Sequence, residues 1–140
     1  VLTSEAEGIT ALIRDGRWTG KAGFETSLQL VDGFLDLWEH HRPVLRVVDL
    51  ATAEGDMRFQ NVRTHFLNEL TKALCDVIDG FRRQGRHPRD LEAMAHASVL
   101  VSMLAHVAAH RYGFEFWGIR TSAIRDSTAR LLHAGVTGKR

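Results

Sequence analysis

The fold of this chain is decided by residues 91–112, which read LEAMAHASVLVSMLAHVAAHRY. The stretch contains no Pro or Gly, is rich in Ala, Leu and Met, and lies between Pro88 and Gly113. These residue types favour helix and the flanking residues end it, so the stretch predicts one helix of about 22 residues, roughly 33 Å long.

At the helical period this helix has two apolar faces. The first face carries nearly only small side chains, Leu91, Ala95, Ser98, Ser102, Ala105 and Ala109. The opposite face carries larger ones, Leu100, Met103, Leu104 and Val107. A helix that is apolar nearly all round is buried on two sides, and one chain of 140 residues can hardly cover both. We therefore expect a homodimer in which the small face is the interface.

The composition is that of one ordinary globular domain spanning residues 1–140. The formal net charge of +1 gives no electrostatic reason to expect contact with nucleic acid or an anionic membrane. A single cysteine, Cys75, excludes an internal disulfide and fits a reducing compartment. The longest apolar run is too short to span a bilayer and no signal peptide is visible, so a cytoplasmic location is expected.

The remaining long segments also have the helical period rather than the two-residue period of a strand. Arg42-Pro43 and Gly55 interrupt the pattern, because the residue before proline is displaced from the helical region and glycine breaks helices. The sequence thus predicts an all-α domain of about six helices. Besides residues 91–112, the predicted helices are residues 4–15, 24–41, 44–53, 56–83 and 115–133.

This order of helices resembles the C-terminal regulatory domain of tetracycline-repressor-like (TetR) transcription regulators. The resemblance rests on EGDMRF at residues 54–59 with Arg63 following, RQGRHP at residues 83–88, and the apolar helix at residues 93–109. It covers most of the chain from about Phe24 onward. There is no catalytic signature, and neither an enzymatic activity nor a cofactor is expected.

The resemblance implies that the last two long helices of each subunit form a four-helix dimer bundle. On the second of these helices the expected interface residues are Trp117, Ile124, Thr128 and Leu131. It also implies a mostly apolar cavity inside each subunit, which binds a small apolar or amphipathic effector and thereby modulates DNA binding. Operator DNA is expected to be bound only through an N-terminal helix-turn-helix domain, for which the residues before Phe24 are too few. Since the chain begins at Val1 rather than at methionine, it was either processed or is a piece of a longer protein, and we expect that this domain was trimmed or left out.

A cavity of this kind needs large apolar walls and a few polar groups that orient the ligand. The wall candidates, which could equally fill a solid core, are Phe34, Trp38, Phe59, Phe66, Leu70, Leu100, Met103 and Val107. Arg63 interrupts the apolar stripe between Phe59 and Phe66, where a charge needs a partner. It pairs with an acid such as Asp49 or Glu54, extends along the apolar surface to reach solvent, or anchors a ligand carboxylate or carbonyl.

His106 and His110 are four residues apart on one helix, a spacing that lets two imidazoles share a metal ion. A third ligand such as His96 lies far round the helix, so no metal site is expected and a place at the dimer or pocket edge is favoured. Two alternatives to the regulator remain open. They are a stand-alone helical module that binds a small molecule, and a small helical metalloprotein that uses His106 and His110.

Overall fold

The computed structural model describes the backbone of residues 2–55 and 57–138, and within this part it contains helices and no strand. Side chains are described for residues 4–47, 50, 54–55 and 67–138. The all-α prediction is confirmed. The six helices of the described part are α1 (Leu2–Asp15), α2 (Gly20–Ala53), α3 (Met57–Arg83), α4 (Ala93–Ala109), α5 (Arg111–Phe116) and α6 (Thr121–Thr137).

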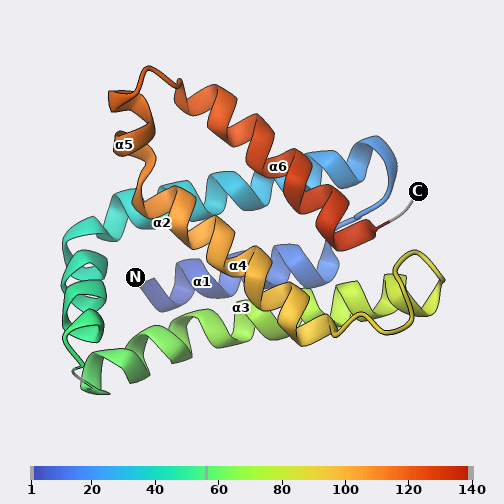
Figure 1. Cartoon of the computed structure of the whole chain (residues 1–140), viewed down its shortest axis with the longest axis horizontal. Coiled ribbons are helices and arrows are strands. Elements are labelled where there is room, and N and C mark those ends of the chain that lie inside the picture. Colours follow the sequence, from blue (N-terminus) through green and yellow to red (C-terminus); the bar gives the residue numbers. More distant parts are fainter. Residues whose placement is uncertain (1, 56, 139–140) are drawn as a thin grey trace.

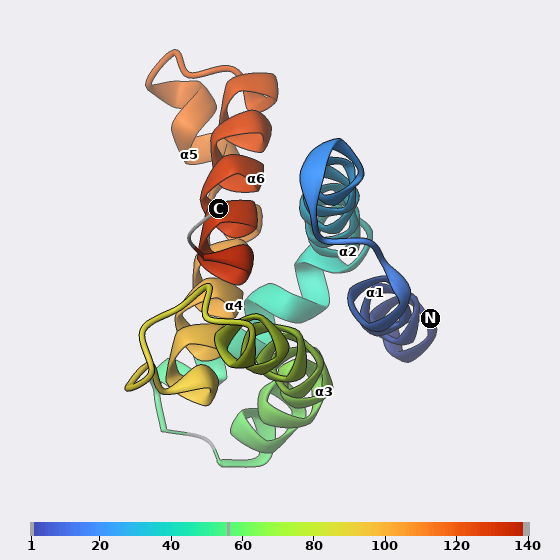
Figure 2. The same cartoon turned by 90° about the vertical axis from the view of Figure 1, so that its right-hand side faces the viewer.

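The long helices form two groups that pack on one another (Figure 1, Figure 2). Helix α1 packs against α2 and α3, and the antiparallel pair α4 and α6 covers the other side of α2 and α3. The short helix α5 joins α4 to α6 at one end of this pair. No helix in the described part of the chain combines the length and the apolarity needed to cross a membrane.

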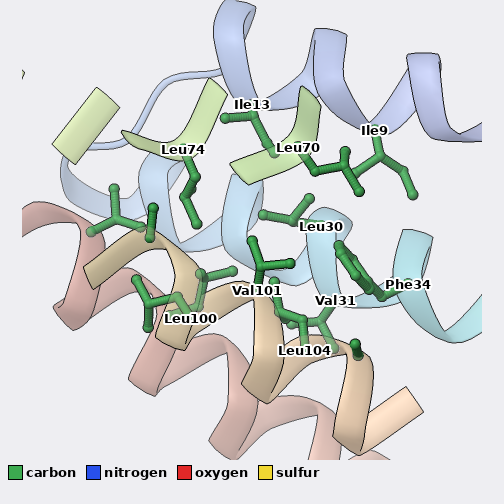
Figure 3. Packing of buried hydrophobic residues seen from close by; sticks show 14 of the residues in the cluster. Ile9, Ile13, Leu30, Val31, Phe34, Leu70, Leu74, Leu100, Val101 and Leu104 are labelled. Atoms are coloured by element: carbon green, nitrogen blue, oxygen red, sulfur yellow. The ribbon is translucent and has the colours of Figure 1, made fainter. Parts of the chain in front are cut away.

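The core lies where α1, α2, α3 and α4 meet, and Figure 3 shows their apolar side chains directed into one common space. Each fully buried side chain of this size stabilises the fold by roughly 1.5–3 kcal/mol relative to exposure. The labelled members, all buried, are Ile9, Ile13, Leu30, Val31, Phe34, Leu70, Leu74, Leu100, Val101 and Leu104.

Helix α2 is kinked where the sequence predicts a break between two helices. His41 has φ −120° and ψ 19°, outside the helical region, and Pro43 follows two residues later. Proline has no N–H for the helical ladder and its ring crowds the preceding turn, which accounts for the kink. The predicted helices 24–41 and 44–53 are therefore the two arms of one bent helix, which starts at Gly20.

The prediction of one unbroken helix over residues 91–112 is wrong at both ends. Glu92 is the N-cap of α4, since its carboxylate accepts hydrogen bonds from the amides of Met94 and Ala95. At the other end the helix stops at Ala109, whose carbonyl accepts from Nη1 of Arg42 at 3.2 Å. An arginine from another helix thus takes a carbonyl that would otherwise continue the helical ladder, and the chain turns into α5.

The last helix also differs from the predicted range of 115–133. Gly118 has φ 84° and separates α5 from α6, and α6 continues to Thr137 instead of closing before Gly135. Three side chains from the link before α4 and from α4 itself donate to the terminal carbonyls of α6. They are His96 to Gly135 at 2.8 Å, His87 to Val136 at 2.8 Å and Arg86 to Thr137 at 3.0 Å. These donors satisfy carbonyls that a helix end leaves open, and so the helix extends past Gly135.

Candidate functional site

A pocket with a volume of about 430 Å³ lies between the kinked part of α2 and the C-terminal end of α4. This volume is within the usual range of small-molecule sites. Four lining residues come from α2 on both sides of the kink, and two come from the end of α4. The described lining residues are Trp38, Arg42, Arg46, Leu50, Ala109 and His110.

Arg42 fixes the geometry of the pocket because it joins its two walls. Its Nη1 donates to the carbonyl of Ala109 at 3.2 Å, and its Nη2 lies 3.4 Å from the carbonyl of Ala108. A cation at a helix C-terminus is favourable, because the last carbonyls carry partial negative charge. The guanidinium carbon also lies 4.8 Å from the ring centre of Tyr112. Arg42 thus ties the kink of α2 to the C-terminal end of α4.

Glu39 and Tyr112 connect the same two walls at the surface. The Tyr112 hydroxyl donates to Oε1 of Glu39 at 2.6 Å, and Arg42 and Arg111 lie 3.4 Å and 3.9 Å from Oε2. The hydrogen bond from Tyr112 holds the pKa of Glu39 below its ordinary value, with the neighbouring arginines acting in the same direction. In turn, the hydrogen bond to Glu39 raises the pKa of Tyr112.

On its other side the kink is held to α1. Nδ1 of His40 donates to Oε1 of Glu5 at 3.0 Å, and His41 contacts the second carboxylate oxygen. These hydrogen bonds, that of His40 before that of His41, lower the pKa of Glu5. Consecutive residues of α2 thus contact α1 through His40 and His41, and α4 through Arg42.

The structure places the predicted ligand residues in three different settings. Trp38 lines the pocket, and its ring stacks on Phe34 with centroids 6.0 Å apart. Phe34, Leu70 and Leu100 are buried in the core, 1%, 0% and 7% exposed, and do not line the pocket. Met103 and Val107 are half-buried. The side chains of Phe59, Arg63 and Phe66 lie outside the described residues, as does that of Asp49.

Arg42, Arg46 and Leu50 were not among the predicted ligand residues, although a sequence signal exists for them. With Trp38 they form a series at intervals of four residues, which places neighbours on one helix face. Ending the helix at Arg42-Pro43 hid this series, because it assigned Trp38 and Leu50 to different helices. The bent but continuous α2 brings them into one wall.

His106 and His110 lie beside one another with stacked rings, 4.1 Å between centroids. Nδ1 of His110 donates to the carbonyl of His106 at 2.9 Å, and His110 lines the pocket. His96 is turned away to the carbonyl of Gly135. Among the described residues no group of three or more His, Cys, Asp or Glu side chains is arranged to hold a metal ion.

The predicted dimer residues also separate by exposure. Ala105 and Thr128 are each 5% exposed and lie beneath the surface of the chain, so they add little area to a contact between chains. Val99, which the prediction omitted, is 67% exposed on α4. The exposed predicted residues are Ala95, Ser98, Ser102, Trp117 and Leu131, and the half-buried ones are Leu91, Ala109 and Ile124.

Comparison with known proteins gives one match. The family described as "Tetracyclin repressor-like, C-terminal domain" matches residues 9–140 of the chain. No curated protein and no solved structure matches it. The match spans the pocket, the kink and both helices of the α4–α6 pair.

Proposed function

The chain belongs to the tetracycline-repressor-like C-terminal domain family, and on this premise we propose that it senses a small apolar or amphipathic effector and forms a homodimer. Domains of this family have a regulatory role in ligand binding and dimerisation. The observation that carries the proposal is the pocket at the α2 kink, because it combines apolar surface from Trp38 and Leu50 with two arginine side chains. Sites that bind amphipathic molecules have this mixture of apolar walls and few polar groups.

Dimerisation is assigned to the outer surface of α4 and α6. This surface has small or apolar exposed side chains, including Val99 at 67% and Leu131 at 61% exposure. Pairing with a second copy would remove this apolar area from water and form a four-helix bundle. Helix α4 then takes part in both functions, because its outer face meets the partner and its C-terminal end lines the pocket.

A mechanism follows from the contacts of the kink. An effector that enters the pocket competes with or strengthens the contacts of Arg42 to α4, and the adjacent His40 and His41 are bonded to Glu5 of α1. Movement of the kink would thereby shift α1. Contact with operator DNA is assigned to a helix-turn-helix domain of the kind that the family carries. The regulator would then have a DNA-bound and a released conformation. To shift nearly all molecules from the first to the second, the effector must bind the released conformation more tightly than the DNA-bound one by roughly 5 kcal/mol.

Native mass spectrometry of the purified 140-residue chain tests this proposal. The expected result is a dimer that releases about one small molecule per subunit under mild dissociation. A monomer without any bound molecule, even after incubation with a cell extract of metabolites, would contradict both parts. A dimer that never carries a small molecule would contradict the sensor part alone.

A further inference from the structure

The side chains of the pocket wall on α2 change in character from one end of the wall to the other. Trp38, Arg42, Arg46 and Leu50 follow one another at intervals of four residues, so the wall runs from an aromatic group over two guanidinium groups to an aliphatic group. The facing wall supplies Ala109 and His110. None of the described lining residues is a carboxylate. The described lining is therefore basic in its middle and apolar at its ends.

The described residues neutralise the positive charge of this wall only in part. The carboxylate that pairs with Arg42 among the described residues is that of Glu39 at 3.4 Å, which also accepts from Tyr112 at 2.6 Å. Arg46 makes no hydrogen bond or ion pair with any residue that the structure describes. Like charges four residues apart on a helix repel one another by a few tenths of a kcal/mol. An anion bound between the two guanidinium groups would attract both of them and offset this repulsion.

The two arginines are not equally available to a ligand. Arg42 already directs its Nη atoms to the carbonyls of Ala108 and Ala109. Arg46 donates none of its five N–H groups to a residue that the structure describes, and their planar fork matches the oxygen atoms of a carboxylate or sulfonate. His110 uses Nδ1 for the carbonyl of His106, which leaves its Nε2 as a further polar contact at the pocket.

We propose that the effector is a small organic anion, with a carboxylate or similar group held by Arg46 and an apolar body packed on Trp38 and Leu50. Arg42 serves as a positioning residue that keeps α4 at the right distance. This inference rests on the proposed sensor function and narrows its ligand to one chemical class. A neutral molecule of the same shape would gain the apolar contacts without the charge-assisted hydrogen bonds.

Two fluorescent probes with the same ring system separate these contributions. 8-Anilinonaphthalene-1-sulfonate carries a sulfonate, and N-phenyl-1-naphthylamine lacks it. Each is titrated into the 140-residue chain, with the binding constant read from dye fluorescence and from quenching of tryptophan emission. The anionic dye is expected to bind about tenfold more tightly than the neutral one, since a hydrogen bond to a charged group is worth this much or more.

Arg46→Gln is the deciding variant, and Arg46→Lys and Arg89→Gln are its controls. Arg46 and Arg89 are both exposed, so the fold is expected to survive, and circular dichroism checks this. Arg46→Gln should remove most of the tenfold preference and change neutral-dye binding less than twofold. Arg46→Lys should retain part of the preference. Arg89→Gln makes the same change of charge away from the pocket and should leave both dyes unaffected.

The outcomes distinguish failure of this inference from failure of the proposed function. If both dyes bind equally well and Arg46→Gln changes neither, the anion assignment is overturned while the pocket remains a binding site. The same holds if Arg89→Gln weakens the anionic dye as much as Arg46→Gln does, because the preference then reflects overall charge. If neither dye binds saturably and native mass spectrometry finds no bound molecule, the sensor function itself is overturned.

Discussion

Tyr112 and Glu39 are 73 residues apart in the chain, and their side chains share a hydrogen bond of 2.6 Å. The bond joins the start of α5 to α2 two residues before the kink at His41, beside the pocket. Arg42 lies against both partners, 3.4 Å from the carboxylate and 4.8 Å from the ring centre. The side chain that sets the pocket geometry is thus itself held in place by a tyrosine and a glutamate.

This arrangement predicts an elevated phenol pKa, and the chain has only one tyrosine to report it. The hydrogen bond to Glu39 raises the pKa of Tyr112 above its ordinary value of 10.0, because the carboxylate disfavours a second negative charge. Titration of the tyrosinate absorbance should therefore show a midpoint above 10.0. Glu39→Gln should lower the midpoint, since it removes the negative charge and leaves Arg42 and Arg111 nearby.

Glu7→Gln, on an exposed position of α1, is the control for that titration and should leave the midpoint where it is. A wild-type midpoint at or below 10.0 would show that the bond between Tyr112 and Glu39 does not form.

The hydrogen bonds of Glu5 lead us to expect that the free energy of unfolding decreases in acid. Its hydrogen bonds with His40 and then His41 lower the pKa of Glu5 below 4.5, its ordinary value. A group with a depressed folded-state pKa adds stability that is fully present above the unfolded value and disappears as the pH falls through the folded one. The free energy of unfolding of wild type should therefore exceed that of Glu5→Gln above pH 4.5, with a difference that shrinks below it.

Urea unfolding over this pH range measures that difference, with Glu7→Gln as the matched removal of a carboxylate. A difference between wild type and Glu5→Gln that stays constant with pH would exclude the link between α1 and the kink.

Much of the fold could be predicted from the periodicity of the sequence, but the ends of the helices could not. The two-faced pattern of residues 91–112 identifies the central helix correctly. Its end at Ala109 depends on Arg42, which lies 67 residues earlier in the chain. The extension of α6 to Thr137 likewise depends on His87, His96 and Arg86. Local helix propensity does not depend on such distant donors, so it cannot predict these helix ends.

The pocket was harder to predict from the sequence than the fold. Of the predicted wall residues, Trp38 lines it, and several others lie in the core. Large apolar residues such as Phe34 and Leu70 suit a solid core as well as a cavity, and the structure uses both in the core. The pocket forms instead where Pro43 bends α2 away from regular packing. The polar part of the pocket comes from Arg42 and Arg46, which share a face with Trp38 only when α2 continues past Arg42-Pro43.

A substitution at Gly23 tests how closely the loop before α2 packs against α6. A Cβ at this position would overlap the carbonyl of Trp18, which is held by a 3.0 Å hydrogen bond from Nε2 of His133. The Trp18 indole is fixed as well, donating to the carbonyl of Ile13 at 3.0 Å. Because neither group can yield easily, Gly23→Ala should lower the free energy of unfolding by about 2–3 kcal/mol.

Gly80→Ala is the matched control, because the Cβ it would add to α3 meets nothing within 4 Å beyond the neighbouring backbone of its own helix. It should raise the free energy of unfolding by about 1 kcal/mol, the helix preference of alanine over glycine. Denaturant titrations of both variants measure the contrast. Equal effects in the two would mean that the approach of Trp18 to Gly23 is not close in solution.

The proposed dimer surface is tested by charge substitution at two exposed valines. Val99 on α4 is 67% exposed and Val44 on α2 is 56% exposed, so each can become glutamate without entering the core. A carboxylate buried in an apolar contact costs several kcal/mol, and Val99→Glu should weaken dimerisation by about 100-fold or more. Val44→Glu should leave the dimer intact. Sedimentation over a range of protein concentrations measures the dimerisation of both variants. If Val44→Glu dissociates the dimer and Val99→Glu does not, the interface lies on the part of α2 after the kink and not on α4.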